Sequence, residues 1–494
     1  MCGIVGFIGC KPAAPLLLEG LAKLEYRGYD SAGIALAGEN GVVIHKAKGR
    51  LGVLREMIGD GAGLPETAGI GHTRWATHGK PSDENSHPHR SASGRFAVVH
   101  NGIIENYAAL KKEMQEEGVV FLSETDTEVI AHLIEKAYAG DFLSAVRAAV
   151  ARLEGSYALG VLCSEHPDEL IAVRRSSPLV VGLAKEGNFI ASDVPAVLSH
   201  TRRFYQLADG ETAVLRRDGV TVFDGAGRPV QKVEMQVTWD VSSAEKGGYP
   251  HFMIKEIMEQ PQALSATISP RISPEGRIVL DGISLTAAQL KKVSRIYIVA
   301  CGSAYHAGVV GKYVLEKLTR IPVEVDLASE FRYRDPIVDS RTLVLIISQS
   351  GETADTLAAL REAKKRGGRV LSIVNVVGSS IASESDDVLY TWAGPEISVA
   401  TTKAYSTQLT MLYLIAFYIA EKLGHIDDRD LRRLLSALVR LPDMVSGILR
   451  QASEIEQLAQ RYAYLEHAYF IGRNLDYAVA LEASLKLKEI SYIH

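Results

Sequence analysis

The stretch "TLVLIISQSGETADTLAAL", residues 342–360, decides how the second half of this chain folds. It begins with an almost unbroken apolar run, 342–348, which is typical of a strand buried on both faces of a sheet. The polar turn "SQSGET" then leads into a segment, 354–367, that has the apolar spacing of a helix. A strand, a polar turn and a helix in this order predict one unit of a parallel α/β sheet.

The same alternation continues on both sides of this unit. Further strand-like and helical segments lie at 295–300, 304–318, 369–376 and 407–423. Apolar strands that are separated by helices predict a doubly wound parallel sheet. We therefore expect an α/β domain over 291–430, preceded by a linker and a helical lead-in over 241–290.

A weaker repeat lies near the end of the chain. The segment "HAYFIGRNLDYAVALEASLKLKEI" (467–490) matches "RIYIVACGSAYHAGVVGKYVLEKL" (295–318) in its apolar strand, Gly-containing turn and helix. This predicts the start of a second α/β domain over 455–494. Because one strand and one helix do not complete a parallel sheet, we expect this second domain to be truncated and the chain to be a fragment.

The first 240 residues follow a different pattern. Short strands dominate, such as "SYALGVLC" and "LIAVRR", with a few helical segments such as "PLLLEGLAKL". The polar stretch "TWDVSSAEKGGYPHF" interrupts them, which puts a domain boundary near residue 241. The sequence therefore predicts an α+β domain over 1–240.

The composition of the chain excludes several classes of partner. The chain has 494 residues, a formal net charge of −5 and no long basic run, so no nucleic-acid partner or anionic membrane surface is expected. Its longest apolar stretch, 409–420, is too short to span a bilayer, and the N-terminus lacks signal-peptide features. The four cysteines have neither CxxC nor zinc-ligand spacing, so we expect no metal, no disulfide framework and a reducing cytoplasm.

Cys2 follows the initiator Met directly in "MCGIVGFIGC". Removal of Met1 would leave one residue with a thiol and a free α-amine, which is a nucleophile with its own base. The α-amine suits this role because its unperturbed pKa is ~7.7–8.0. The alternative, an ordinary buried cysteine in a core strand, stays open on this stretch alone.

Three further motifs carry groups that such a nucleophile needs. Arg74 in "HTRWATHG" suits a carboxylate, and Asp126 in "SETDTEVI" suits an ammonium group. Asn101 and Gly102 in "HNGIIEN" offer two adjacent oxyanion donors in a turn after the strand "FAVVH". Taken singly, each has a plainer alternative: a surface charge, a helix N-cap and a β-turn. Together they predict a site that hydrolyses the side-chain amide of an amino acid.

The turn "SQSGET" carries Ser348, Gln349, Ser350 and Thr353 at the start of a helix. Backbone N–H groups and the helix dipole favour an anion there, although helix capping is the plainer alternative. The turn in "IVACGSAYHAG" follows the preceding strand, and we expect the two turns to form a sugar-phosphate cleft. Neither GxxxxGK(S/T) nor GxGxxG is present, so no ATP, dinucleotide or other cofactor is expected.

The motifs "CGIVG", "LEYRGYDSAG", "GHTRWATHG", "HPH", "VHNGIIEN", "SETDTEV", "SQSGETADT" and "VATTKAYSTQL" resemble the glucosamine-6-phosphate synthase family over the whole chain. That resemblance implies an N-terminal-nucleophile (Ntn) hydrolase domain of the glutamine amidotransferase type, followed by sugar isomerase (SIS) domains. It also implies hydrolysis of glutamine, transfer of ammonia to fructose 6-phosphate, and a homodimer. Relatives would continue past residue 494 with a His loop and a catalytic Lys.

The resemblance assigns roles to particular residues. Cys2 would attack glutamine, Asn101 and Gly102 would form the oxyanion hole, and Lys486 and Glu489 would take part in sugar isomerisation. The residues expected to hold or order the glutamine site are Arg27, Arg74, Trp75, Thr77, His78 and Asp126. Those expected at the sugar phosphate are Gly302, Ser303, Ser348, Gln349, Ser350, Thr353, Val399, Ala400 and Thr402.

Two points weaken these assignments. Glu482, Lys486 and Glu489 share one helical face, which is also typical of a surface salt-bridge pattern. Ala304 stands where the family often has a serine, so a hydroxyl for the phosphate is missing there.

Other functions stay open from sequence. A different amidotransferase is one, although the SGGxDS-like loop expected of an asparagine synthetase is absent. A phosphoribosylamine-forming enzyme, a glutaminase-only fragment and a sugar-phosphate-binding protein without synthase activity are the others.

Overall fold

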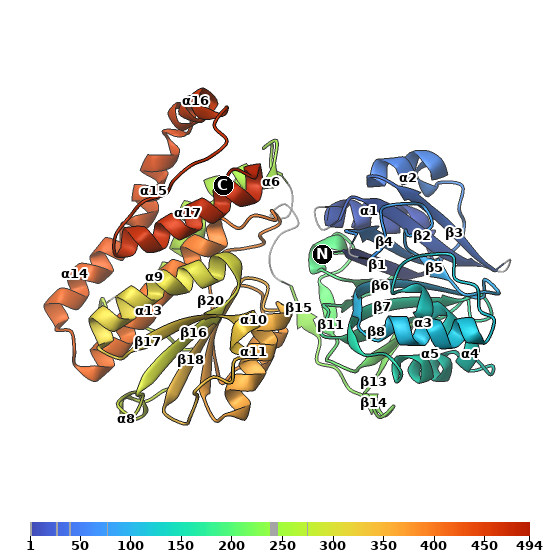
Figure 1. Cartoon of the computed structure of the whole chain (residues 1–494), viewed down its shortest axis with the longest axis horizontal. Helices are drawn as coiled ribbons and strands as arrows, with labels where there is room; N and C mark the ends of the chain where they lie inside the picture. Colours follow the sequence, from blue (N-terminus) through green and yellow to red (C-terminus); the bar gives the residue numbers. More distant parts are fainter. Residues whose placement is uncertain (1, 26–27, 39–40, 77, 238–245, 274) are drawn as a thin grey trace. The chain divides into compact units, whose positions relative to one another are not determined.

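The structure is a computed structural model, and it divides the chain into two compact units, Met1–Val241 and Ser242–His494 (Figure 1). Two residues expected at the glutamine site, Arg27 and Thr77, lie outside the described residues. The described residues are 2–25, 28–38, 41–76, 78–237, 246–273 and 275–494.

The first unit contains two antiparallel sheets. Within the described residues, one sheet has eight strands, in the order β15 (Met235–Gln236), β11 (Arg203–Gln206), β9 (Val180–Ala184), β10 (Gly187–Ala191), β1 (Gly3–Gly9), β4 (Ala68–Arg74), β2 (Ser31–Gly38) and β3 (Gly41–Lys48). The other has seven, in the order β14 (Pro229–Val230), β13 (Gly219–Phe223), β12 (Thr212–Arg216), β8 (Leu170–Arg175), β7 (Gly155–Cys163), β6 (Phe96–Ile104) and β5 (His89–Arg90).

Helices cover the outer face of each sheet, so the unit has four layers (Figure 1). Strand β1 shows why: Val5 and Phe7 pack with the helical side chains, whereas Ile4 and Ile8 join the core shared by both sheets. The helices on the first sheet are α1 (Ala13–Leu24) and α2 (Leu51–Ile58). Those on the second are α3 (Tyr107–Glu116), α4 (Glu128–Ala137) and α5 (Phe142–Val150).

The second unit is built on a parallel sheet. Its five described strands run in the order β17 (Val323–Leu327), β16 (Arg295–Ala300), β18 (Thr342–Ser348), β19 (Arg369–Val374) and β20 (Asp387–Tyr390). Helices α9 (Gly302–Thr319) and α13 (Lys403–Leu423) cover one face. Helices α10 (Ala328–Phe331), α11 (Ala354–Lys365) and α12 (Ser380–Glu384) cover the other. The strand order reverses between β16 and β18, where open α/β sheets bind ligands.

The remaining helices of this unit lead into the sheet or follow it. Helices α6 (Phe252–Met258), α7 (Gln260–Ile268) and α8 (Ala287–Leu290) precede β16. After α13 come α14 (Asp428–Val439), α15 (Leu441–Leu449), α16 (Ala452–Tyr462) and α17 (Leu475–Ser491). The last of these, α17, packs along α9 (Figure 1). Short 3₁₀ helices lie at Gly59–Gly61, Val194–Ala196 and Ser269–Arg271.

The predicted fold class is confirmed: an α+β unit precedes a parallel, doubly wound α/β sheet. One local prediction is wrong, because the apolar segment before α17 forms no strand, and its Tyr469 and Ile471 are exposed. A strand needs a hydrogen-bonded neighbour, and none of the described strands pairs with this segment. A second α/β domain starting near residue 455 therefore stays a prediction.

Candidate active sites

The first unit contains a cavity of about 320 Å³. Cys2 reaches it from the start of β1, Arg74 from the end of β4 and Asn101 from within β6. The residues expected at the glutamine site that line this cavity are Cys2, Arg74, Trp75, Asn101, Gly102 and Asp126. The lining residues that sequence analysis missed are His87, His100, Ile103, Thr125, Thr127, Ser156, Ser177 and Pro178.

The thiol of Cys2 lies against the backbone of Trp75. Its Sγ accepts a hydrogen bond from the Trp75 N–H at 3.2 Å. Burial raises the pKa of the Cys2 thiol above its usual value, although this hydrogen bond acts in the opposite direction. The thiol is therefore protonated at neutral pH, and nucleophilic attack by Cys2 requires a base close to Sγ.

Asn101 and Gly102 lie inside β6 rather than in a turn after it, which corrects the prediction. They pair with Ala158 and Tyr157 of β7. Gly102 has φ +137°, and a Cβ there would lie 2.0 Å from the carbonyl oxygen of Ser156. Only glycine fits this position. The Asn101 Nδ2 donates to the carbonyl oxygen of Cys2 at 2.9 Å, so the amide lies beside the candidate nucleophile.

Arg74 is buried and only half of its guanidinium is bonded. Its Nη2 donates to the carbonyl oxygens of His78 and Gly79. Its Nη1 is buried and has no hydrogen-bond partner among the described residues. An unsatisfied buried donor is unfavourable, so this atom is suited to an incoming carboxylate. His78 itself is not among the residues lining the cavity, and it acts on Arg74 through its backbone.

Asp126 lies just before α4 without capping it. The N-cap of α4 is Thr127, and its side chain makes no capping hydrogen bond. The Oδ2 of Asp126 instead accepts the N–H of Ile104 at 2.9 Å. A buried carboxylate that lines the cavity is thus fixed to the end of β6, in a position to attract an ammonium group.

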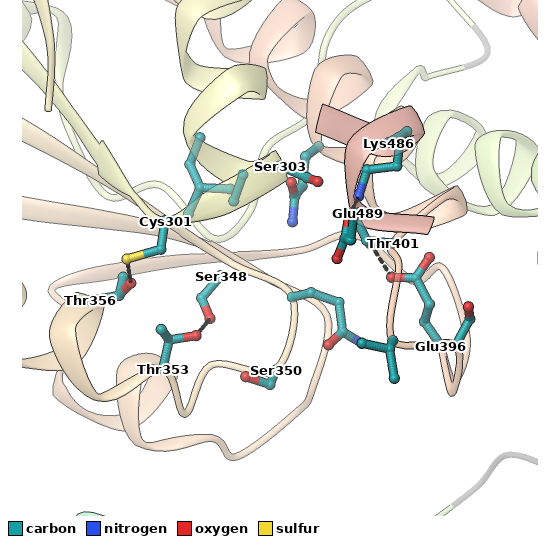
Figure 2. Close-up of a pocket in the computed structure, with 16 residues that line it drawn as sticks. Cys301, Ser303, Ser348, Ser350, Thr353, Thr356, Glu396, Thr401, Lys486 and Glu489 are labelled. Carbon is teal, nitrogen blue, oxygen red and sulfur yellow. Dashed lines mark hydrogen bonds and ion pairs between the residues drawn. The ribbon is translucent and has the colours of Figure 1, made fainter. Parts of the chain in front are cut away.

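The second unit has a cavity of about 250 Å³ at the carboxyl ends of β16 and β18 (Figure 2). The residues expected at the sugar phosphate or in isomerisation that line it are Ser303, Ser348, Gln349, Ser350, Thr353, Val399, Lys486 and Glu489. The lining residues that sequence analysis missed are Cys301, Ile347, Thr356, Glu396, Ser398, Thr401 and Gln408; Ala304, noted from the sequence as lacking a hydroxyl for the phosphate, also lines the cavity.

Three expected residues, Gly302, Ala400 and Thr402, are not among those lining this cavity. Gly302 begins α9 with φ +57°, and Ala400 is buried. Thr402 is the residue before α13, and its N–H donates to Glu396 at 2.9 Å. These three residues therefore shape the backbone around the cavity rather than its surface.

The turn after β18 is held by its own hydroxyl groups. Ser348 Oγ accepts the N–H of Gly351 at 3.0 Å and lies 3.2 Å from Thr353 Oγ1. Thr353 precedes α11 but makes no side-chain capping bond to it. The hydroxyl of Thr353 thus faces the cavity instead of capping the helix, and Figure 2 shows it beside Ser348 and Ser350.

Lys486 and Glu489 reach the same cavity from α17 (Figure 2). The Lys486 Nζ lies 2.5 Å from Glu489 Oε2 and 3.5 Å from Glu482 Oε1. Glu482 is buried, and its Oε2 lies 2.8 Å from His306 Nδ1 of α9. This chain of contacts fixes α17 to α9 and holds the pair at the cavity, where Lys486 is half-buried and Glu489 is exposed.

Some of the lining residues that sequence analysis missed lie in a recognisable motif, and others do not. His87 belongs to the quoted "HPH" motif, although the motif was given no role. Glu396 lies in a loop without a motif, and it acts by accepting the backbone N–H groups of Thr402 and Ala404. Glu396 follows no N-cap or other motif, so its sequence did not indicate this role.

Comparison with known proteins agrees with this organisation. Residues 72–199 match the "Glutamine amidotransferase domain" family, and residues 289–418 match the "SIS domain" family. A glutamine--fructose-6-phosphate aminotransferase (isomerizing) of Caldanaerobacter subterraneus subsp. tengcongensis is 59% identical over 494 residues, which are 100% of this chain and 81% of that protein. The protein of the same name from Clostridium tetani is 56% identical with the same coverage.

A solved structure also matches, that of the C-terminal domain of glucosamine-fructose-6-phosphate aminotransferase from Francisella tularensis. It is 44% identical, covers 51% of this chain and 70% of its own, and has a TM-score of 0.49. The curated relatives and the two domain matches define a glutamine amidotransferase joined to a sugar isomerase domain. The chain belongs to the family of isomerizing glutamine–fructose-6-phosphate aminotransferases, which confirms the resemblance seen in its sequence.

Neither a membrane-spanning helix nor a metal site is found among the described residues. No helix there has the length and hydropathy needed to cross a bilayer. No group of three or more His, Cys, Asp or Glu side chains there is arranged to hold a metal ion.

Proposed function

We propose that this chain hydrolyses glutamine in its first unit and transfers the ammonia to fructose 6-phosphate in its second, giving glutamate and glucosamine 6-phosphate. The names of its relatives support this reaction. The observation that carries it is the first cavity, where the Cys2 thiol, the Asn101 amide, the Asp126 carboxylate and Arg74 Nη1, which has no partner among the described residues, meet. A free amino acid with a side-chain amide satisfies all four groups.

In the first unit, Cys2 is the nucleophile. After removal of Met1, the α-amine of Cys2 takes the thiol proton as Sγ attacks the glutamine amide carbon. Asn101 and Gly102 donate to the oxyanion of the tetrahedral intermediate. The proton passes to the amide nitrogen, ammonia leaves, and water then hydrolyses the thioester to release glutamate and restore the thiol.

The same cavity recognises the two charged ends of glutamine. Arg74 binds the α-carboxylate through Nη1, and Asp126 binds the α-ammonium group. His78 keeps Arg74 in place through its carbonyl oxygen. Trp75, which is 43% exposed, gates the passage of ammonia. Arg27 and Thr77 complete this site by family resemblance.

In the second unit, Ser348, Gln349, Ser350 and Thr353 bind the phosphate at the N-terminus of α11. Glu489 moves a proton between C1 and C2 of the sugar, with Lys486 beside it. The residues proposed to border the sugar are Ser303 and Val399, and Gly302, Ala400 and Thr402, which were expected there too, are proposed to shape the backbone behind them. The reaction requires no metal or cofactor, since both steps are acid–base and nucleophilic chemistry.

We also propose that the protein is cytoplasmic and acts as a homodimer without a nucleic-acid or membrane partner. Four free cysteines support a reducing compartment. The net charge of −5 gives no attraction to nucleic acid.

Separate measurement of the two products tests the proposal. Glutamate is expected to form from glutamine, and glucosamine 6-phosphate is expected only when fructose 6-phosphate is also present. Glutamate without glucosamine 6-phosphate would indicate a glutaminase alone. Binding of fructose 6-phosphate without either product would indicate a sugar-phosphate-binding protein.

A further inference from the structure

Buried histidines gather at the glutamine cavity, and two of them, His87 and His100, line it. His72 of β4, His87, His89 and His100 are each at most 5% exposed. The ring of His72 stacks on that of His87 at 4.1 Å, and His87 meets His89 edge to face at 4.7 Å. None of the four has a role in the mechanism above, although such polar rings are unfavourable in a core without a function or full hydrogen bonding.

His72 is the member of this cluster that contacts the catalytic machinery. Its Nε2 lies 3.0 Å from Asn101 Oδ1 and 3.0 Å from the carbonyl oxygen of His100. Both neighbours are acceptors, so Nε2 carries the proton and donates. The other ring nitrogen, Nδ1, is buried and has no partner among the described residues. The tautomer of His72 is therefore fixed by its surroundings.

This donor determines which way the Asn101 amide points. With Oδ1 held by His72, Nδ2 faces the other side and donates to the Cys2 carbonyl oxygen at 2.9 Å. The flipped amide would bring two donors together at His72 and two acceptors together at Cys2. We propose that His72 is a positioning residue that keeps the Asn101 amide nitrogen, rather than its oxygen, turned toward the oxyanion that forms when Cys2 attacks glutamine.

The surroundings of His72 suit such a role. The stacked ring of His87 limits its rotation, and His87 Nδ1 in turn accepts the N–H of His100 at 3.4 Å. Burial lowers the pKa of His72 to about 3, so its ring stays neutral throughout the working pH range. A neutral donor orients the amide without adding a charge next to the Cys2 thiol.

The inference rests on the proposed function, because it assumes that Asn101 stabilises the oxyanion. Loss of one oxyanion donor lowers kcat about 10²–10³-fold, and this is the effect expected of Asn101→Ala. His72→Phe keeps the ring and its stacking but removes the donor. We expect it to lower kcat for glutamine hydrolysis about 10–100-fold, with KM changed less than about threefold.

Two further variants separate positioning from packing. His72→Gln places an amide nitrogen the same number of bonds from Cα as Nε2, and it should recover kcat to within about tenfold of the unmodified protein. His89→Phe is the matched control. His89 is also buried, contacts Thr125 Oγ1 at 3.1 Å and does not line the cavity. The kcat of the His89→Phe variant should therefore stay within about threefold of that of the unmodified protein.

The decisive experiment is a double-mutant cycle on the 494-residue protein, with glutamate release as the readout. If His72 acts through Asn101, then His72→Phe should lower kcat less than about threefold in the Asn101→Ala background. Full multiplication of the two effects would overturn the positioning role, as would equal losses in His72→Phe and His89→Phe. An Asn101→Ala variant with unchanged kcat would instead overturn the proposed oxyanion role of Asn101.

Discussion

The two cavities are lined by different kinds of side chain. The first, in the antiparallel unit, is lined by buried Arg74 at the end of β4 and by buried Asp126 just before α4, and each can neutralise one end of a zwitterion. The second, in the parallel unit, faces its ligand mainly with the neutral groups of Ser348, Gln349, Ser350 and Thr353. Its one lining cation among the described residues, Lys486, is already paired with Glu489. The two cavities share no lining residue. A substitution in one of them should therefore abolish binding or reaction there and leave the other unchanged.

The largest expected effect is on the first site. Cys2→Ala should lower glutamine hydrolysis more than about 10³-fold because the nucleophile is lost. Fructose 6-phosphate binding, followed by calorimetry, should be unchanged. Cys10→Ala is the control, since Cys10 is an exposed thiol of the same unit outside the cavity. Undiminished glutamate release by Cys2→Ala would remove the basis for the first site.

The second site should respond to loss of its hydroxyl groups. Ser350→Ala and Thr353→Ala should each weaken fructose 6-phosphate binding by about 1.5–3 kcal/mol, because each removes a hydrogen bond to a charged group. Calorimetry measures this change, and glutamine hydrolysis should persist. Ser383→Ala, in α12 outside the cavity, is the control. Unchanged affinity in both variants would make the turn a structural element only.

The second unit should have a pH response of its own, which comes from Glu256. Burial raises the pKa of Glu256 to about 7, with the nearby Glu396 acting in the same direction and Lys403 against it. Glu256 accepts the N–H groups of Ile397 and Ser398, which lead into the loop at the cavity.

Because the folded pKa of Glu256 lies above the unfolded value of 4.5, its contribution to stability is complete below pH 4.5. That contribution is lost as the pH rises through 7. For the unfolding of the second unit, this contribution of Glu256 should fall by up to about 3 kcal/mol across the window. Denaturant titrations of Glu256→Gln should show a flatter profile, whereas the exposed Asp281→Asn should leave the slope as it was. An unchanged slope in Glu256→Gln would mean that another group causes the response.

The smallest expected effect concerns salt. Since the proposed phosphate donors of the second cavity are neutral, raising the ionic strength from about 0.05 M to about 0.3 M should weaken fructose 6-phosphate binding less than about threefold. Calorimetry at several salt concentrations checks this. A loss of about tenfold or more would show that unpaired cations dominate phosphate binding.

The sequence predicted those strands whose burial on both faces makes them apolar throughout. The central strands β16 and β18 are apolar throughout, and both were predicted with nearly their observed bounds. The edge strands β17 and β20 were missed because one of their sides faces no neighbour and their sequences, "VEVDL" and "DVLY", mix polar with apolar residues.

For the candidate sites too, some residues were predicted from motifs and others were not. Motifs such as "HTRWATHG" and "SQSGET" located residues that line the two cavities. The buried histidines lie within quoted motifs but were given no role, because a polar ring in a core has no periodicity and its partners lie far away in sequence. His72 and Asn101, for example, are 29 residues apart and meet only through the pairing of strands. The strand predicted before α17 was wrong because apolar composition does not supply a neighbouring strand.

The central claim is that the Cys2 thiol in the first cavity reacts with glutamine. It is tested most directly by treating the 494-residue protein with a glutamine analogue that carries an electrophilic carbon in place of the amide, followed by peptide mass spectrometry. We predict one adduct per chain, on an N-terminal Cys2 peptide that lacks Met1. Excess glutamine should prevent the adduct, and fructose 6-phosphate should not. Labelling of Cys10, Cys163 or Cys301 instead, or labelling of Cys2 that glutamine does not slow, would contradict the account.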